Sequence, residues 1–327
     1  MRVAADYRDP VSELIRKRAT LMKKGVVIIL MLTLVAACGR AEPEADPAAY
    51  DQEVLDWRAG RLERLLAPTG YLNQIGLYWL ETGTYVLGSD PASDIVMPLT
   101  AAPRIAEIIV GDEGVRMVAE EGVEVFVDGQ AVSDMPLLPD VSGQAVMVSH
   151  RSLAWMLIER GGKLAIRVRD YEHPFVESFG PLPYYDIDPA MRVTAKLEPY
   201  AEPRTIAVDT VIEGFQQFPV APGVASFELN GQQFDLEPTV SGDKLFFVFG
   251  DATNRDETYG AGRFVYADAP GDDGLLILDF NLSYSPPCAF NDFSTCPIAS
   301  PRNRLPIRIE AGEKFSQDLH YSGPAGH

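Results

Sequence analysis

Short apolar runs separated by turn residues make up most of this chain, and they constrain its fold more than any other feature. From residue 72 on, each run is four to six residues long, and Gly-Asp, Asp-Gly, Ser-Gly or Gly-Gly pairs stand between many of them. Such runs are typical of strands in a sandwich or barrel, so we predict a mainly β protein. The predicted strands are 75–80, 84–87, 106–110, 116–119, 123–127, 145–149, 154–159, 163–168, 192–197, 204–208, 225–229, 232–236, 244–249, 263–266, 275–280 and 306–309.

One helix precedes these strands. Apolar residues recur at near-helical spacing from Tyr50 to Leu66, and Pro68 with Gly70 closes the segment, so we predict a helix over 49–70 that packs its apolar face on the protein. Asn230-Gly231, between two alternating runs, is the strongest hairpin signal.

The length of the β region indicates more than one domain. About 290 residues with this strand pattern predict two β domains rather than one. Gly180-Pro-Leu-Pro183 is typical of a connector, so we predict one domain over 71–180 and an antiparallel β domain over 181–327.

The segment from Met22 to Cys38, MKKGVVIILMLTLVAAC, resembles a bacterial lipoprotein signal peptide. Two lysines precede an apolar run, and small residues stand directly before the cysteine. The run is shorter than the ~20 residues that cross a bilayer. We therefore expect a signal peptide over 1–37 with Met22 as the true start. The resemblance implies lipid attachment at Cys38, and residues 38–48 have the composition of a tether.

Removal of residues 1–37 leaves 21 basic and 44 acidic side chains, a net charge of −23. Such a surface repels nucleic acid, so we expect no nucleic-acid partner and attachment to a lipid bilayer through acylated Cys38. The expected location is the cell envelope, as a membrane-anchored lipoprotein on the periplasmic side. The lipoprotein resemblance implies that Gly39 favours the outer membrane in a Gram-negative cell. The sequence sets no oligomeric state.

The stretch from Gly83 to Pro98, GTYVLGSDPASDIVMP, and the later pair Asp128-Gly129 resemble the opening and closing signatures of a forkhead-associated domain. The resemblance implies a forkhead-associated-like β-sandwich over 71–180. In that family an arginine that holds phosphothreonine follows the glycine, but Ser89 occupies that position here. A phosphate site without this arginine lacks its bidentate partner, so we expect the fold without phosphopeptide binding.

The mature chain is also similar to the bacterial and archaeal family called domain of unknown function 1684. Its most specific motifs here are TYGAGR at 258–263, DFN at 279–281, YSPPCAF at 284–290, TCP at 295–297 and NRLP at 303–306. The family name implies no activity, so the residues themselves must indicate the function.

A polar cluster is predicted within these motifs. Side chains alternate along a strand, and a turn at Pro270 and Gly271 would fold 263–266 against 275–280 as a hairpin. Arg263 would then lie nearly opposite Asp279. The candidate ligand-binding residues are Tyr259, Arg263, Asp279, Asn281 and Tyr284.

Three interpretations of this cluster remain open. It can tie the long final loop to the sheet, bind a small molecule or peptide, or carry out catalysis with Asp279 as a general base beside Arg263. The sequence thus favours an uncharacterised envelope lipoprotein that is a binding or structural module with a small-ligand or peptide pocket in its C-terminal β domain. The alternative is a hydrolase-like enzyme that uses Asp279 and Arg263.

Once Cys38 carries lipid, two cysteines remain. An even remainder in an exported protein favours a disulfide between Cys288 and Cys296, with reduced structural thiols, a metal site and a catalytic cysteine as alternatives. The four histidines do not converge in sequence, and no Cys-x-x-Cys pair is present, so we expect no metal. Gly260-Ala-Gly262 lacks the context of a phosphate loop, and we expect no cofactor.

Overall fold

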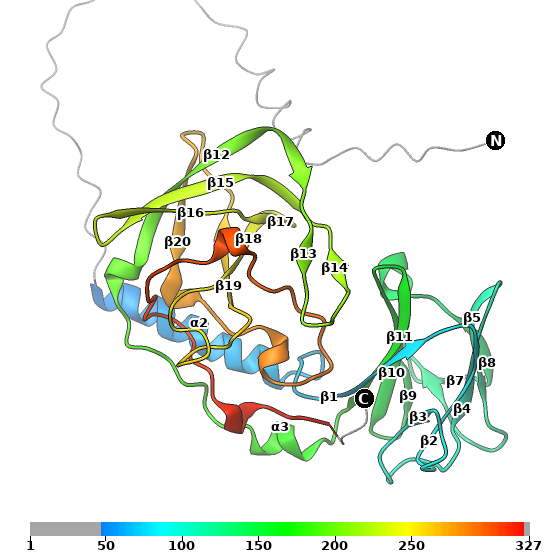
Figure 1. The fold of residues 1–327 in the computed structure, drawn as a ribbon. Helices are drawn as coiled ribbons and strands as arrows, with labels where there is room; N and C mark the ends of the chain where they lie inside the picture. The colour runs from blue at the N-terminus through cyan, green and yellow to red at the C-terminus, as the bar shows by residue number, and fades with distance from the viewer. Residues whose placement is uncertain (1–46, 324–327) are drawn as a thin grey trace, which may run out of the picture. The chain divides into compact units, whose positions relative to one another are not determined.

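The computed structural model describes residues 47–323, and this part of the chain is mainly β, as predicted, with one long helix at its start (Figure 1). The predicted signal peptide, the lipid-bearing Cys38 and nearly all of the tether lie outside the described residues. Within 47–323, no helix is both long and apolar enough to cross a membrane.

Residues 74–170 form two sheets. The six-stranded sheet has the order β1-β11-β10-β9-β6-β7 and the five-stranded sheet the order β3-β2-β4-β5-β8, with antiparallel neighbours except for the parallel pair β2 and β3. The strands are β1 (Gln74–Leu80), β2 (Gly83–Gly88), β3 (Ile95–Val96), β4 (Ala106–Gly111), β5 (Gly114–Ala119), β6 (Phe126–Val127), β7 (Gln130–Ala131), β8 (Asp134–Leu137), β9 (Val148–His150), β10 (Leu153–Arg160) and β11 (Lys163–Asp170). Side chains of both sheets, including Leu87, Met117 and Trp155, share one core.

Residues 192–279 form three further sheets, of orders β16-β15-β12-β20, β17-β18-β19 and β13-β14. The strands are β12 (Arg192–Thr205), β13 (Val208–Asp209), β14 (Gln216–Gln217), β15 (Val220–Leu229), β16 (Gln232–Leu236), β17 (Thr239–Ser241), β18 (Lys244–Phe249), β19 (Arg263–Asp268) and β20 (Leu275–Asp279). The four-stranded and three-stranded sheets share a core that includes Phe227, Phe247 and Leu278.

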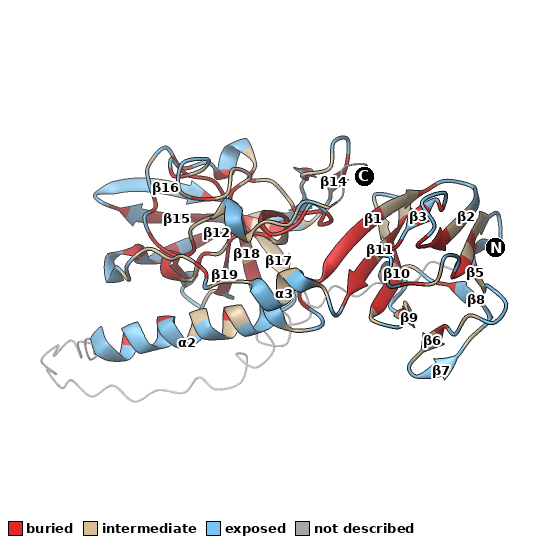
Figure 2. Ribbon diagram, turned by 90° about the horizontal axis from the view of Figure 1, so that it is seen from below, coloured by how far each residue is buried: buried red, intermediate tan, exposed pale blue. Residues whose placement is uncertain are grey.

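The alternation read from the sequence matches burial along these strands (Figure 2). In β12, Val193, Ala195 and Leu197 are buried, whereas the residues between them are exposed, because successive side chains point to opposite faces. The predicted hairpin at Asn230-Gly231 is confirmed: Leu229 pairs with Gln232 across the turn, and the two turn residues have φ of 52° and 74°, as a two-residue type I′ connection requires.

The predicted helix is confirmed as α2 (Pro47–Leu66), which buries Tyr50, Val54, Arg61 and Leu65. Leu65 packs in a cluster with Leu182 and Phe290, so this first element of the described chain lies against its last third. The remaining helical segments are short: α3 (Pro174–Ser178), η1 (Asp140–Ser142), η2 (Pro189–Met191), η3 (Phe280–Leu282), η4 (Pro287–Ala289), η5 (Pro301–Asn303) and η6 (Gln317–Leu319).

The strand predicted at 306–309 is wrong, because this segment is a loop. The backbone groups of Ile309 are satisfied by buried side chains instead of a neighbouring strand. The N–H of Ile309 donates to Asp251 at 3.3 Å, and its carbonyl accepts from Arg263 at 2.7 Å. An apolar alternating run can therefore be buried without joining a sheet.

Candidate functional site

The predicted hairpin between 263–266 and 275–280 is wrong. Strand β19 pairs with β18, which places Phe249 opposite Arg263, whereas β20 pairs with β12, which places Arg192 opposite Asp279. The turn between β19 and β20 carries the chain from one sheet to another. Sequence alternation defines the faces of a strand but not its partner, and here each strand pairs with an edge formed elsewhere in the chain.

Arg263 is consequently held by a different carboxylate from the one predicted. Its guanidinium is fully buried, forms an ion pair with Asp251 at 2.5 Å and donates to the carbonyls of Ile309 and Ala311. Burial lowers the pKa of Arg263, and the adjacent Asp251 opposes that shift. These contacts tie the final loop to β19. The Arg263 Nε has no hydrogen-bond partner among the described residues, but the side chain is fully buried, so a ligand from solvent does not reach it.

Asp279 and Asn281 lie together, as the sequence indicated, but their third partner comes from the first helix. The Tyr50 hydroxyl donates to Asp279 at 2.9 Å, and the Asn281 N–H donates to the same carboxylate at 3.0 Å. The Asn281 side-chain amide donates to the Tyr50 hydroxyl at 2.9 Å and to the carbonyl of Asp188 at 2.8 Å. The cluster therefore joins α2, the connector before β12 and the end of β20.

Burial raises the pKa of the Asp279 carboxyl, although the hydrogen bonds from Tyr50 and Asn281 and the charge of Arg192 act against it. Above the ordinary carboxyl pKa, the unfolded chain has lost this proton while the folded protein still holds it. Stability must then fall as pH rises from the ordinary value through the raised folded value.

We expect Asp279→Asn to remove this fall. The free energy of unfolding, measured by urea titration at a series of pH values above 4, should decline less steeply for the variant than for the unchanged protein. Asp235→Asn, at an exposed carboxylate on β16, is the matched control and should follow the unchanged protein. Parallel curves for Asp279→Asn and the unchanged protein would contradict the prediction.

The two predicted tyrosines lie in different surroundings. Tyr259 packs edge-on against Phe315 and hydrogen-bonds the thiol of Cys288. Tyr284 is stacked under the guanidinium of Arg61, which lies 4.6 Å from the ring centroid, and packs against Trp57 with ring centroids 6.1 Å apart. Tyr284, unlike Tyr259, forms part of the wall of a cavity.

Cys288 and Cys296 are buried neighbours, present in the structure as thiols. The N–H of Cys288 donates to the Cys296 sulfur at 3.1 Å, and the two side chains also interact. Burial, together with Cys296, raises the pKa of the Cys288 thiol. The disulfide stays a prediction. Within residues 47–323, no group of three or more His, Cys, Asp or Glu side chains is placed to hold a metal ion.

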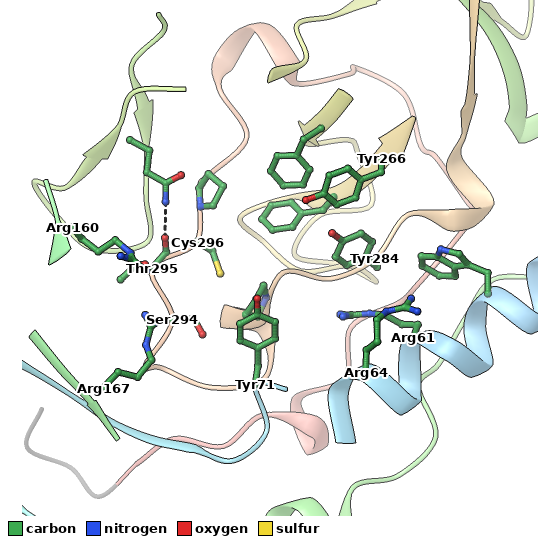
Figure 3. Close-up of a pocket in the computed structure, with 16 residues that line it drawn as sticks. Arg61, Arg64, Tyr71, Arg160, Arg167, Tyr266, Tyr284, Ser294, Thr295 and Cys296 are labelled. Atoms are coloured by element: carbon green, nitrogen blue, oxygen red, sulfur yellow. Dashed lines mark hydrogen bonds between the residues drawn. The ribbon is translucent and has the colours of Figure 1, made fainter. Parts of the chain in front are cut away.

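A cavity of about 500 Å³ lies where α2, β19, the loop around 284–297 and the ends of β10 and β11 meet (Figure 3). Part of its wall is aromatic. The aromatic lining residues are Trp57, Tyr71, Phe246, Phe264, Tyr266 and Tyr284. Tyr71 and Tyr266 are 39% and 41% exposed, so the cavity opens to solvent at these rings.

The charged side chains that line this cavity are four arginines, with no carboxylate among them. Figure 3 shows Arg61 and Arg64 of α2 on one side and Arg160 and Arg167 of the β10–β11 pair on the other. Carboxylates behind the wall neutralise two of the four. Arg61 pairs with buried Glu313 at 3.3 Å, and Arg160 pairs with Asp140 at 2.7 Å.

The other two guanidinium groups, those of Arg64 and Arg167, have no carboxylate within 4 Å in the part of the chain that the structure describes. The Nε atom of Arg167 is buried and lacks a hydrogen-bond partner there. Burial, with repulsion from Arg160 and Arg169, lowers the pKa of Arg167 to about 10, so it stays cationic at neutral pH. A local excess of positive charge thus lines a cavity in a chain of net charge −19.

Of the candidate ligand-binding residues, only Tyr284 lines this cavity, together with Cys296 of the predicted disulfide. Sequence reasoning missed the arginines because they come from three separated segments. Arg61 and Arg64 stand three residues apart, a spacing that places them on one helix face, and this was the available signal. Nothing in the sequence indicated that this helix face would share a cavity with Arg167 of β11.

Residues 177–314 match the family model described as protein of unknown function DUF1684. An uncharacterized protein of Haloarcula marismortui, solved by solution NMR, is 30% identical over 44% of this chain and 80% of its own, with a TM-score of 0.37. The FHA-2 domain of an ABC transporter of Mycobacterium tuberculosis is 23% identical over 27% of this chain and 77% of its own, with a TM-score of 0.21. No curated protein sequence matches the chain.

Proposed function

Because residues 177–314 belong to DUF1684, a family of unknown function, we propose a function from the cavity itself: this protein binds a small organic anion. The observation that carries the proposal is the lining of the cavity, in which arginines are the charged groups and aromatic rings supply the apolar surface. Its volume of about 500 Å³ lies within the range of small-molecule sites, about 300–1,000 Å³.

The guanidinium groups of these arginines suit the recognition of an anion with two or more oxygens. A guanidinium group donates two parallel hydrogen bonds to a carboxylate, sulfonate or phosphate. Arg61 is already fixed by Glu313 and by the Ser285 carbonyl, which accepts from it at 2.9 Å, so it shapes the wall. Arg64 and Arg167 hold the uncompensated charge, and Arg167 gains the partner that its buried Nε lacks when an anion enters.

The hydrolase-like alternative has no support in this geometry. It requires Asp279 and Arg263 in one pocket, but Arg263 is sealed against Asp251 and Asp279 is held by Tyr50 and Asn281. Neither residue lines the 500 Å³ cavity with its four arginines, which we call the arginine cavity.

We further propose that the binding module is displayed in the cell envelope, tethered to a membrane through acylated Cys38. The lipoprotein-like segment before Gly39 supports this placement, as does the strongly acidic composition, which leaves lipid acylation as the means of attachment. In that arrangement α2 follows the tether directly.

The proposal is tested with 1-anilinonaphthalene-8-sulfonate, a fluorescent aromatic anion, titrated into the folded protein. We expect saturable binding that weakens with added salt. Arg167→Met should weaken it about tenfold or more, since hydrogen bonds to charged groups contribute about 1.5–3 kcal/mol. Arg64→Met should cost about two- to fivefold, because exposed ion pairs contribute about 0.2–1 kcal/mol.

The matched control is Arg116→Met. Arg116 lies on β5, is exposed and pairs with Asp134, and it does not line the cavity. Its replacement should leave the fluorescence titration unchanged. Equal affinities for the unchanged protein and all three variants, with circular dichroism showing folded protein, would overturn the proposal.

A further inference from the structure

A second cavity, of about 210 Å³, lies beside the arginine cavity. Its walls contain aliphatic side chains, among them Ile206, Val208, Val240, Val248 and Ile298. The one charged residue in its lining is Glu237, whose carboxylate is taken up by Arg204 at 2.6 Å and by the Tyr200 hydroxyl. This cavity therefore offers apolar surface beside neutral polar side chains, among them Thr239, Ser241 and Asn303, and its lining holds no cation.

The two cavities share part of their lining, namely Gln217, Phe246, Tyr266 and Pro297. The rings of Phe246 and Tyr266 pack with centroids 4.8 Å apart. The Gln217 side-chain amide reaches across and donates to the Thr295 carbonyl at 3.1 Å. Because the same side chains face both spaces, the divide between the cavities is one layer of side chains thick.

Tyr266 stands where this divide meets solvent, since it is 41% exposed. Its ring packs against that of Phe246. Among the described contacts, its hydroxyl makes no hydrogen bond. The Tyr266 ring can therefore rotate without breaking a hydrogen bond of a buried polar group. A ligand can thus span both cavities along the exposed side of the divide.

From this arrangement we infer that the ligand is an amphiphilic anion, whose head group binds the arginines while an aliphatic chain occupies the second cavity. The inference rests on the proposed anion-binding function and adds the chemical class of the ligand. The head can be a carboxylate, sulfonate or phosphate, since guanidinium groups donate hydrogen bonds to the oxygens of all three. The chain is aliphatic because five branched aliphatic side chains and two prolines, against two aromatic rings, make up the apolar part of the lining of the second cavity.

The experiment is isothermal titration calorimetry of the folded protein with the unbranched 1-alkanesulfonates from ethane- to octanesulfonate, each below its micelle concentration. The charge is constant across this series, so affinity reports the chain alone. We expect binding to tighten roughly three- to fourfold for each added methylene, the gain from burying that group, until the second cavity is full.

Two variants fill the second cavity without touching the arginine cavity: Val240→Phe and, should that variant fail to fold, Ser300→Leu. Each should abolish the gain with chain length. Val96→Phe is the control, because Val96 is a 42% exposed valine that lines neither cavity, and it should keep the gain.

The outcomes separate this inference from the function on which it rests. In one outcome, the affinity for alkanesulfonates is independent of chain length, while anilinonaphthalenesulfonate still binds and Arg167→Met still weakens that binding. This result overturns the inference of an amphiphilic ligand and leaves the proposed anion binding intact. A chain-length gain that persists in both filled variants also overturns it, since the chain then lies elsewhere. If the unchanged protein binds neither anilinonaphthalenesulfonate nor any alkanesulfonate, the proposed function itself is overturned.

Discussion

Replacing Arg263 by alanine is expected to lower the free energy of unfolding by about 3–5 kcal/mol, the cost of breaking a buried ion pair by removing one partner. The substitution leaves Asp251 buried without its cation. It also removes the hydrogen bonds that Arg263 donates to the carbonyls of Ile309 and Ala311 inside the protein. Urea denaturation followed by circular dichroism measures the change.

The control for this prediction is Arg308→Ala. Arg308 also pairs with several carboxylates, Asp256, Glu257 and Glu310, but its side chain is 39% exposed. Exposed pairs contribute about 0–1 kcal/mol, so this variant should remain close to the unchanged protein. Similar losses for the two variants would show that burial is not what makes Arg263 essential.

The double variant Arg263→Met with Asp251→Leu separates the ion pair from the loop contacts. Removing both charges leaves no unpaired buried carboxylate. Replacing a buried ion pair by apolar residues often changes the free energy of unfolding very little. The Ile309 carbonyl still loses its donor, and the N–H groups of Ile309 and Thr253 lose Asp251 as their acceptor, so only part of the stability should return.

The second large effect is expected at Gly312. Its φ of +77° is strained for any residue with a side chain, and a Cβ there would lie 2.2 Å from the Ser283 hydroxyl and 2.7 Å from the Phe280 carbonyl. Gly312→Ala therefore adds about 1–3 kcal/mol of crowding to about 1–2 kcal/mol of backbone strain. We expect a total loss of about 2–5 kcal/mol in the same urea assay.

Gly231 provides the matched control, because its φ of +74° is nearly the same and a Cβ there meets no atom within 4 Å. Gly231→Ala should cost only the backbone part, about 1–2 kcal/mol. If the two alanine variants lose the same stability, the close approach of the final loop to Ser283 is not the reason that Gly312 is required.

Both predictions concern the packing of the final loop against β19 and the end of β20. Arg263 holds the loop by its carbonyls, and Gly312 lets the backbone pass close to Ser283. Glu313, the next residue, pairs with Arg61 of α2. The family motifs between residues 258 and 306, together with the final loop, therefore position one wall of the arginine cavity. Most of the polar residues of these motifs do not face the cavity.

Local patterns in the sequence predicted the helix at the start of the described chain, most of the strands and the Asn230-Gly231 turn. These features depend on side-chain periodicity or on the backbone angles of two adjacent residues, and both can be read over a short window. The candidate site was predicted less well. Asp279 and Asn281 are neighbours in the chain and do lie together, whereas Arg263 was assigned to the wrong carboxylate.

The sequence by itself thus determined most of the strands, the Asn230-Gly231 turn and which side chains of a strand share a face. Only the tertiary structure decided that β19 and β20 join different sheets, that Tyr50 completes the Asp279 cluster and that Arg64 and Arg167 line the same cavity. Periodicity specifies the direction of a side chain relative to its own backbone. Contacts between residues about a hundred positions apart depend on how whole elements pack, and no local pattern carries that information.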